Sequence, residues 1–367
     1  MYRSVKKEMA LQLNFNTIRS MRSVWKNNVV RQHCMKRLDL LECSRTTGSI
    51  NTSRSSSSLL YDYGTTIDMR TGTGRCYSPC SLSFSTSSAS SSTVSSNKTF
   101  DHNDLSVRYL DGEHSGIVVF ALNRPAAKNS FSKNLVKLLS EAVSTVTFDK
   151  NARVVIVRSD VAGIFSAGAD LKERAKMKQS EVAPFVSSAR QLITDLGEMP
   201  MPVIAAIDGT ALGGGLELAF SCDIRLAAST AKMGLVETKL AIIPGGGGTQ
   251  RLSRLINPAI AKELMFTARV FDGCEAARLG IVNRAVEQND RGDAAYQAAL
   301  QLAQEILPQG PIAVKMVKKA VNKGIQVDLA SGMAFEEAYY SQVIPTKDRI
   351  EGLTAFREKR TPKYTGE

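Results

Sequence analysis

An apolar run that predicts a buried β-strand leads into a glycine triplet, and this pairing restricts the fold more than any other feature of the chain. Residues 203–208 form the run, and Gly213, Gly214 and Gly215 follow shortly after it. The next residues, 216–220, are mostly apolar, so the glycines predict a loop that turns into a helix with free N–H groups at its start. Such a helix start can hold a developing negative charge on a ligand oxygen.

Strands and helices alternate on the N-terminal side of this turn. Residues 106–110 and 117–122 flank a glycine-containing turn, which predicts a hairpin. Ser132 is expected to cap a helix, residues 154–157 predict another buried strand, and residues 181–196 predict a further helix. Alternating strands and helices predict an α/β core with parallel strand pairing.

The first 97 residues differ in composition from the rest of the chain. They hold thirteen lysines and arginines against five acidic residues, so they carry most of the formal net charge of +12, which is therefore weak support for a nucleic-acid-binding face. Their basic, partly apolar start precedes a stretch rich in serine and threonine, a pattern typical of a mitochondrial transit peptide. The alternative is a weakly basic disordered tail with no targeting role.

The C-terminal part of the sequence predicts helices alone, over residues 294–307, 312–322, 329–343 and 347–359. A helical segment without its own β-layer must cover the core or another subunit, so we expect self-association. No apolar stretch has the length of a membrane-spanning helix, which predicts a soluble mature protein. We therefore predict a leader over residues 1–97, a core over 98–292 and a helical oligomerisation region over 293–367.

Two glutamates are the best candidates for proton transfer. The only histidines, His33, His102 and His114, all precede the second predicted strand, so a carboxylate is expected to do this work in the core. Glu217 and Glu237 each lie beside glycine-rich backbone, and paired carboxylates divide acid and base roles when their surroundings separate their pKa values. The alternatives are a helix-start acid stabilised by the helix dipole for Glu217 and a solvated surface residue for Glu237.

Other common sites fit the sequence poorly. Residues 163–168 have the glycine spacing of a P-loop, but Ala169 and Asp170 stand where Lys and Ser or Thr are required. Leu218 occupies the final glycine position of a dinucleotide-binding fingerprint. Cys222 and Cys274, the two cysteines beyond the leader, lack metal-ligand spacing. We therefore expect neither a metal nor a redox cofactor.

Four separate motifs stand in the order found in one known family. They are Asn-Arg-Pro at 123–125, Phe-Ser-Ala-Gly-Ala-Asp-Leu-Lys at 165–172, the segment 208–217 that ends in Glu217, and the segment 243–251 that holds four consecutive glycines. Together they closely resemble the crotonase (enoyl-CoA hydratase/isomerase) superfamily, over residues 107–359. The resemblance implies a crotonase-like spiral of ββα units with a C-terminal helical region.

The resemblance also assigns roles to individual residues. It implies that the N–H groups of Ala169 and Gly214 form an oxyanion hole for a thioester carbonyl, and that Glu217 and Glu237 hold one water and move its protons. It further implies a set of substrate-binding residues, namely Lys128, Ala169, Asp170, Leu171, Lys172, Gly213, Gly214, Phe356 and Lys359. Lys172 and Lys359 are alternatively ordinary solvated charges, and Phe356 alternatively packs in a helix interface.

The family implies an acyl-CoA substrate, with coenzyme A as part of that substrate and no separate cofactor. The motifs are most similar to members that hydrate 3-methylglutaconyl-CoA to 3-hydroxy-3-methylglutaryl-CoA in leucine degradation, in the mitochondrial matrix and as homotrimers or homohexamers. A methylglutaconyl group adds a distal carboxylate that requires a cation or several donors. Arg174, Lys176 and Lys239 are near the motifs, but the sequence alone does not place any of them beside the acyl chain.

Two other functions stay open at this point. One is enoyl-CoA isomerisation, although the presence of both glutamates favours hydration. The other is binding of AU-rich RNA through Lys133 and Lys137. Glu141 falls one helical turn after Lys137, a pattern that favours a salt-bridged solvent face.

Overall fold

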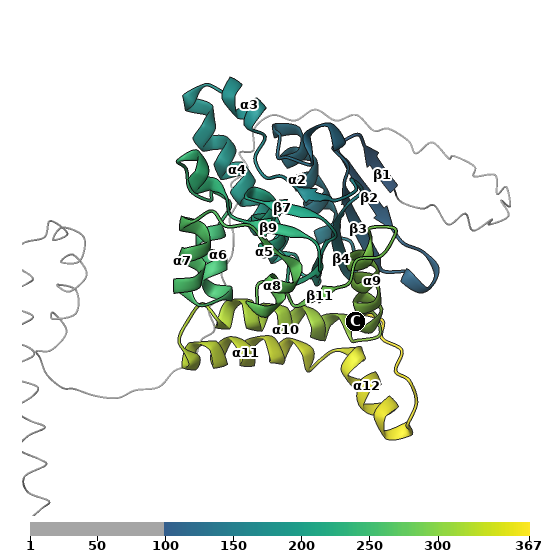
Figure 1. Cartoon of the computed structure of the whole chain (residues 1–367). Helices are drawn as coiled ribbons and strands as arrows, with labels where there is room; N and C mark the ends of the chain where they lie inside the picture. Colours follow the sequence, from purple (N-terminus) through teal and green to yellow (C-terminus); the bar gives the residue numbers. More distant parts are fainter. Residues whose placement is uncertain (1–98) are drawn as a thin grey trace, which may run out of the picture. The chain divides into compact units, whose positions relative to one another are not determined.

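Two β-sheets organise residues 99–367, the part of the chain that the computed structural model describes (Figure 1). The proposed targeting segment, residues 1–97, lies outside the described residues. One sheet has seven strands in the order β1-β2-β3-β4-β6-β8-β11, and the other has four in the order β10-β9-β7-β5. In chain order the strands are β1 (Thr99–His102), β2 (Leu105–Tyr109), β3 (Ile117–Leu122), β4 (Val154–Ser159), β5 (Ile164–Ser166), β6 (Val203–Ile207), β7 (Thr210–Leu212), β8 (Ile224–Ala228), β9 (Lys232–Gly234), β10 (Phe271–Asp272) and β11 (Arg284–Val286).

Helices connect and cover these strands. They are α2 (Lys133–Thr147), α3 (Leu171–Lys176), α4 (Gln179–Glu198), α5 (Gly214–Ser221), α6 (Gly248–Leu255), α7 (Pro258–Phe266), α8 (Gly273–Arg278), α9 (Ala294–Ile306), α10 (Pro311–Gly324), α11 (Leu329–Val343) and α12 (Lys347–Glu358), with short 3₁₀ turns η2 (Gly112–His114), η3 (Pro125–Ala127) and η4 (Glu237–Leu240). The predicted α/β class is therefore confirmed, and so is the Ser132 cap, whose hydroxyl accepts the Leu135 N–H at 3.0 Å.

Strand pairing in the larger sheet matches the predicted hairpin and parallel core. β2 and β3 are antiparallel, with Val107 opposite Phe120. From β3 onward each neighbouring pair is parallel. β4 lies between β3 and β6. Parallel strands need crossover connections, and here helices such as α2 and α4 supply them.

Alternate side chains of β3 enter two separate cores, as the two-residue period of a strand requires. Val118, Phe120 and Leu122 join the larger apolar core. The intervening Ile117, Val119 and Ala121 face the other side, where Ala295, Ala299 and Ala303 of α9 pack against the sheet. Because these three α9 residues are alanines, the helix lies close to the strands.

The four-stranded sheet positions the loops that matter for function. β5, β7 and β9 have three residues each, and none of them was predicted as a strand from the sequence. A three-residue strand is too short to show a two-residue period, so pattern alone does not reveal it. α3, α5 and η4 follow these three strands, and their first turns lie near one another at one edge of the small sheet.

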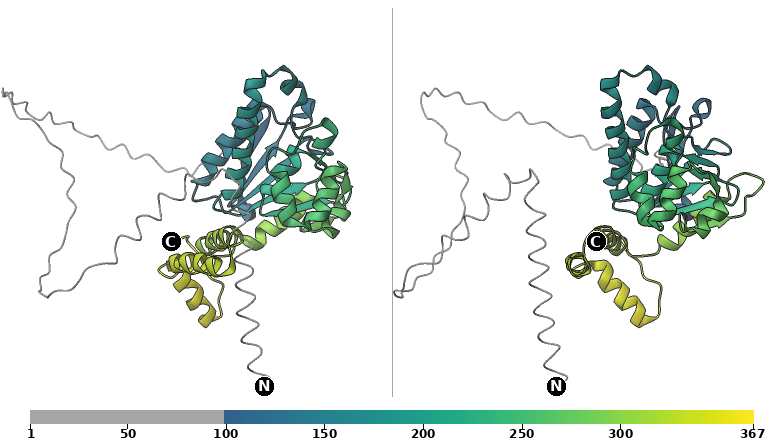
Figure 2. Two further views of the ribbon diagram at one scale, coloured as in Figure 1. Left: turned by 90° about the vertical axis from the view of Figure 1, so that its left-hand side faces the viewer. Right: turned by 60° about the vertical axis from the view of Figure 1, so that its left-hand side comes forward.

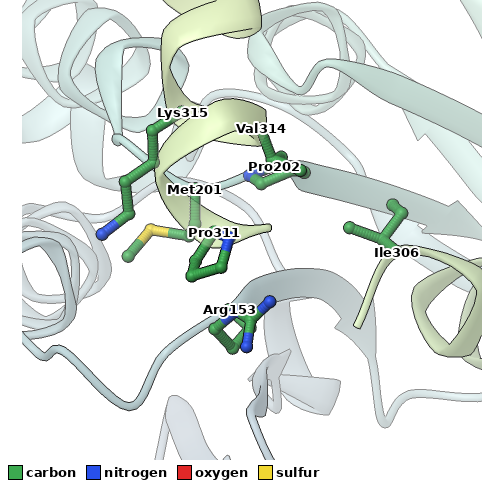
Figure 3. A pocket seen from close by; sticks show the side chains of 7 residues that line it. All are labelled: Arg153, Met201, Pro202, Ile306, Pro311, Val314 and Lys315. Atoms are coloured by element: carbon green, nitrogen blue, oxygen red, sulfur yellow. The ribbon is translucent and has the colours of Figure 1, made fainter. Parts of the chain in front are cut away.

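The C-terminal helices agree with the sequence prediction, with ends shifted by at most two residues. Two cations attach this region to the core. Arg153 donates to the Leu307 and Gln309 carbonyls, in the connection before α10, at 3.0 and 2.6 Å, and Lys318 of α10 pairs with Asp223 at 2.7 Å. Figure 3 shows the junction, where a cavity of about 10 Å³ has room for no more than a single water. α10 lies between the sheets and α11 (Figure 2). No helix within residues 99–367 is both long and apolar enough to cross a membrane.

Candidate active site

A cavity of about 570 Å³ brings most of the predicted site residues together. Its walls come from α4, from the loops after β5, β7 and β9, and from the glycine-rich segment before α6. The lining is mainly apolar but includes Glu217 and Glu237. The predicted residues that line it are Ala169, Leu171, Gly213, Gly214, Glu217 and Glu237.

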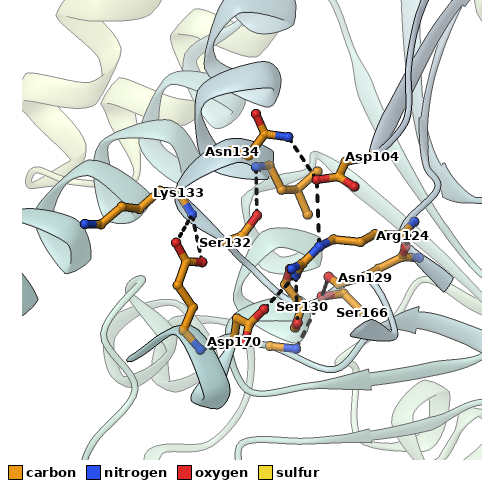
Figure 4. A network of polar contacts seen from close by, with 12 residues as sticks. Asp104, Arg124, Asn129, Ser130, Ser132, Lys133, Asn134, Ser166 and Asp170 are labelled. Carbon is orange, nitrogen blue, oxygen red and sulfur yellow. Dashed lines mark hydrogen bonds and ion pairs between the residues drawn. The ribbon is translucent and has the colours of Figure 1, made fainter. Parts of the chain in front are cut away.

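A network of buried polar groups fixes the loop after β5 (Figure 4). The Asn129 amide donates to Ser159 Oγ at 2.8 Å and to the Phe165 carbonyl at 3.0 Å, and Ser166 Oγ donates to the Asn129 carbonyl at 2.8 Å. Arg124 Nη1 donates to Asp170 Oδ2 at 2.8 Å. Arg124 of the Asn-Arg-Pro motif and Asn129 thus support the loop that carries Ala169.

Asp170 belongs to this support and does not line the cavity. Its carboxylate accepts the Glu173 N–H at 3.0 Å and so caps α3, in addition to its bond with Arg124. Burial by itself would raise the pKa of Asp170, but the hydrogen bonds from Glu173 and Arg124 hold that pKa below its usual range.

Two residues that line the cavity, Ala169 and Gly214, have backbone amides without an acceptor among residues 99–367. Gly214 is the first residue of α5, where an N–H has no intrahelical partner. Ala169 is paired with Phe131 in an isolated parallel bridge, yet its own N–H makes no hydrogen bond there; the Phe131 N–H instead donates to the Gly168 carbonyl at 2.7 Å.

Gly168 allows these two amides to lie close together. Its φ is +87°, and a Cβ at this position would lie 2.7 Å from the Leu212 carbonyl oxygen and 3.0 Å from the Gly214 nitrogen. Both the backbone conformation and the contact distance therefore require glycine. The resulting pair of unpaired N–H groups has the form of a site for a negatively charged oxygen.

Glu217 is held rigidly by the glycine segment before α6. Its side chain is 3% exposed, and its Oε1 accepts the Gly246 N–H at 2.8 Å and the Gly248 N–H at 2.7 Å. A Cβ on Gly246 would lie 2.9 Å from Oε2, so the loop approaches the carboxylate more closely than other residues allow. Burial raises the pKa of Glu217, while these hydrogen bonds and the charge of Arg190 act in the opposite direction.

Glu237 has very different surroundings. Its carboxylate lies over Gly213, where a Cβ would be 3.0 Å from Oε1. Its Oε2 is buried and has no hydrogen-bond partner among the described residues. Burial, with a smaller contribution from the Glu217 charge, raises the pKa of Glu237 to about 7. The two glutamates are thus suited to different protonation states near neutral pH.

Other residues named from the sequence lie outside the lining. Lys128 ends η3 in a left-handed conformation, and its carbonyl accepts the Ala167 N–H at 2.9 Å. Lys172 lies on the exposed side of α3, next to Leu171. Phe356, 87% exposed, and Lys359 lie at the end of α12.

The two lysines considered for RNA binding each lie near a carboxylate. Lys133 Nζ is 3.7 Å from Glu181, and Lys137 Nζ is 3.8 Å from Glu141. These are exposed pairs of modest strength. The sequence pattern indicated the pair with Glu141 but not the pair with Glu181. Binding of AU-rich RNA stays a prediction. Within the described part of the chain, no group of three His, Cys, Asp or Glu side chains is arranged to hold a metal ion.

Sequence reasoning missed the contribution of α4. One face of this helix places Phe185, Val186, Ala189 and Ile193 in the cavity wall, together with Arg190. The spacing of these residues is helical and was visible in the sequence, but it predicted only a packed helix. Nothing in the pattern distinguishes a face that lines a cavity from a face that meets a core.

The two sheets and the cavity between their loops define a crotonase-like α/β protein. A family model described as enoyl-CoA hydratase/isomerase matches residues 112–367, and the chain belongs to this family. The human mitochondrial methylglutaconyl-CoA hydratase is 63% identical over 264 residues, which cover 72% of this chain and 78% of that protein. Human mitochondrial enoyl-CoA hydratase domain-containing protein 2 is 54% identical over 72% of this chain and 90% of its own length.

A solved structure agrees with the fold. The crystal structure of an enoyl-CoA hydratase from Bacillus anthracis superimposes with a TM-score of 0.69 and 46% identity, and the match covers 72% of this chain and 100% of that one. The family match and these relatives support a hydro-lyase.

Proposed function

We propose that the protein hydrates 3-methylglutaconyl-CoA to 3-hydroxy-3-methylglutaryl-CoA, a step of leucine degradation, in the mitochondrial matrix. The observation that carries the hydration chemistry is the pair of glutamates with different surroundings, which share one cavity with two unpaired amides. The relative at 63% identity supports this acyl group. The mitochondrial names of the relatives and the basic leader support the location.

The two amides act on the thioester. The N–H groups of Ala169 and Gly214 donate to the thioester oxygen, which withdraws electrons from the conjugated double bond and makes the β-carbon electrophilic. They then stabilise the enolate oxygen that forms after attack. Loss of one such donor raises the barrier by about 3 to 4 kcal/mol in other enzymes.

The two glutamates manage the protons. The carboxylate form of Glu217 is favoured by the N–H groups of Gly246 and Gly248, and it accepts a proton as the water oxygen bonds to the β-carbon. Glu237, whose pKa is raised to about 7, donates its proton to the α-carbon as the enolate collapses. Hydroxide and a proton have then been added across the double bond. A proton passes from Glu217 back to Glu237 through the next water to restore the starting state.

We assign the CoA part of the substrate to basic and aromatic residues outside the cavity lining. Lys128 is an exposed cation after η3, and Lys172 is an exposed cation in the first turn of α3, close after Ala169 in the chain. Phe356 and Lys359 are exposed on α12 and do not line this chain's cavity, so we assign them to the CoA nucleotide across a subunit boundary of a homotrimer or dimer of trimers.

The test is turnover by the purified protein with 3-methylglutaconyl-CoA and crotonyl-CoA, with the product identified by mass spectrometry. A preference for 3-methylglutaconyl-CoA, lost in folded Glu217→Gln and Glu237→Gln variants, is the expected result. Turnover of crotonyl-CoA alone would reassign the substrate, and movement of the double bond without gain of water would reassign the reaction to isomerisation. Near-normal rates in the glutamine variants would refute the mechanism.

A further inference from the structure

The charged residues of the cavity lining include two that hydration does not use. Its walls hold Glu217 and Glu237, but also Arg174 from α3 and Arg190 from α4. Arg190 is exposed and Arg174 is half-buried, so both charges are open to a ligand that enters the cavity. The two glutamates are committed to the reacting carbons, so the arginines point to a negative charge on the ligand.

Arg190 is anchored beside the reacting centre. Its Nε donates to the Gly245 carbonyl at 2.8 Å, and the N–H of the next residue, Gly246, donates to Glu217 Oε1 at 2.8 Å. The Arg190 charge also acts on the pKa of Glu217. The guanidinium is therefore fixed within electrostatic range of the group that handles the attacking water.

The rest of the Arg190 guanidinium has no partner among residues 99–367. Its Nη1 and Nη2 groups make no hydrogen bond there and form no ion pair within 4 Å. With Nε occupied, these two nitrogens still present the end-on fork that binds a carboxylate through two parallel hydrogen bonds. Arg174 has no side-chain hydrogen bond to the described residues either, but it also lacks an anchor like that of Arg190.

We infer that Arg190 binds a carboxylate at the distal end of the acyl group, so that the cavity selects short dicarboxylic enoyl-CoA thioesters over neutral ones. The inference rests on the proposed hydration. In an acyl group of this class a single methylene separates the carboxylate from the β-carbon, so its partner must lie near the catalytic glutamates, as Arg190 does. The cation also offsets the repulsion that Glu217 and Glu237 exert on an anionic acyl group.

The experiment compares two substrates that differ only at this end. 3-Methylglutaconyl-CoA carries the carboxylate, and 3-methylpent-2-enoyl-CoA carries a methyl group in its place. For Arg190→Met we expect kcat/KM to fall about 100-fold with the carboxylated substrate, the size typical of a lost charge-assisted pair, and only a few-fold with the neutral one. Arg190→Lys keeps the charge but loses the fork, so its loss is intermediate.

Arg174→Met is the matched control, because Arg174 is a cation of the same cavity. We expect it to affect both substrates alike. Equal losses with both substrates in Arg190→Met would reduce Arg190 to a support for the Gly245 loop and overturn the inference. If Arg174→Met instead lost activity with the carboxylated substrate alone, Arg174 would be the residue that binds the carboxylate. That result would also overturn the inference.

Binding separates this inference from the proposed function. Calorimetry with the saturated thioesters 3-methylglutaryl-CoA and 3-methylpentanoyl-CoA requires no turnover. A preference for the dicarboxylic thioester that Arg190→Met removes supports the inference even if the protein hydrates nothing, a result that would overturn the proposed function alone. Hydration of both substrates without preference, with equal binding of both thioesters, would overturn the inference and leave hydration standing.

Discussion

Glu217 and Glu237 carry the same functional group, and the backbone around them makes them chemically different. Glu217 accepts two N–H groups on one oxygen, whereas one oxygen of Glu237 is buried without a partner. A buried carboxylate without donors favours its neutral form. The assignment of acid and base follows from this difference in hydrogen bonding.

The pH dependence of turnover tests that assignment. Because the pKa of Glu237 is raised to about 7, we expect kcat/KM to fall as the pH rises above about 7, when Glu237 loses the proton it donates. The apparent pKa belongs to the coupled pair of glutamates. In Glu237→Gln the residual activity, lower by about 100-fold or more, should lack this alkaline limb. A limb unchanged in the variant would assign it to another group.

The same shift predicts a pH-dependent stability. The folded-state pKa of Glu237 lies above its ordinary value of 4.5, so its contribution to stability is fully present below pH 4.5 and is lost as the pH rises through about 7. Glu237→Gln lacks this loss. Between pH 5 and pH 8 the free energy of unfolding of the variant should therefore rise by about 1 to 2 kcal/mol relative to that of the wild type. This figure allows for solvent screening.

Urea unfolding at the two pH values, at fixed protein concentration, measures the gain. Glu141→Gln, on the exposed side of α2, is the control and should show no such difference. A Glu237→Gln variant whose stability difference from the wild type is the same at both pH values would contradict the raised pKa.

At the scale of elements, the short strands β5 and β7 matter because of the loops that follow them. These loops touch at Gly168. A Cβ added to this glycine would lie only 2.7 Å from the Leu212 carbonyl oxygen. In Gly168→Ala the left-handed φ and this contact should both force the Ala169 N–H away from Gly214. We expect kcat to fall about 100-fold or more, with a loss of stability of about 1 to 3 kcal/mol.

Gly163→Ala is a matched control for that change. Gly163 has a similar φ of +69°, but a Cβ there would have no atom within 4 Å. This variant should lose stability through backbone strain and keep its kcat. Thermal unfolding and turnover measured on both variants separate the two effects, and equal turnover in both would contradict the proposed role of the Gly168 contact.

The sequence predicted the longer elements well and the short ones poorly. The predicted Ser132 cap and the C-terminal helices lie within two residues of their observed positions, because long amphipathic helices and caps are local signals. β5 and β9 have only three residues, and the packing of the small sheet, rather than their own pattern, makes them strands. For the same reason the sequence picked out Glu217 and Glu237 but not Arg190, whose position depends on how α4 meets the Gly245 loop.

At the scale of the whole molecule, the unpartnered apolar surface of the C-terminal helices is the main feature. Val317, Val321 and Ile325 are exposed along α10, and Leu329 and Phe356 are exposed on α11 and α12. Val317, Val321 and Ile325 also line a groove of about 990 Å³ between α10, α4 and α6. Apolar surface of this extent is typical of a subunit contact.

Self-association through this groove is directly measurable. We expect light scattering after size exclusion to give a trimer or hexamer for the wild type, and Val321→Asp to shift the mass toward the monomer and lower the melting temperature. Lys319→Asp, on another side of the same helix, is the control and should keep the assembly. A wild type that is monomeric at micromolar concentration, or a Val321→Asp variant that assembles normally, would contradict the prediction.

The alanines of α9 and the larger side chains of α4 give the two helices different freedom to change. Ala295, Ala299 and Ala303 are fully buried against the larger sheet, so almost any replacement adds volume where none is available. α4 instead presents the half-buried Val186 and the exposed Arg190 to the cavity. A lineage built on this scaffold can therefore acquire a new acyl preference by exchanging these two residues of α4, while α9 keeps the larger sheet unchanged.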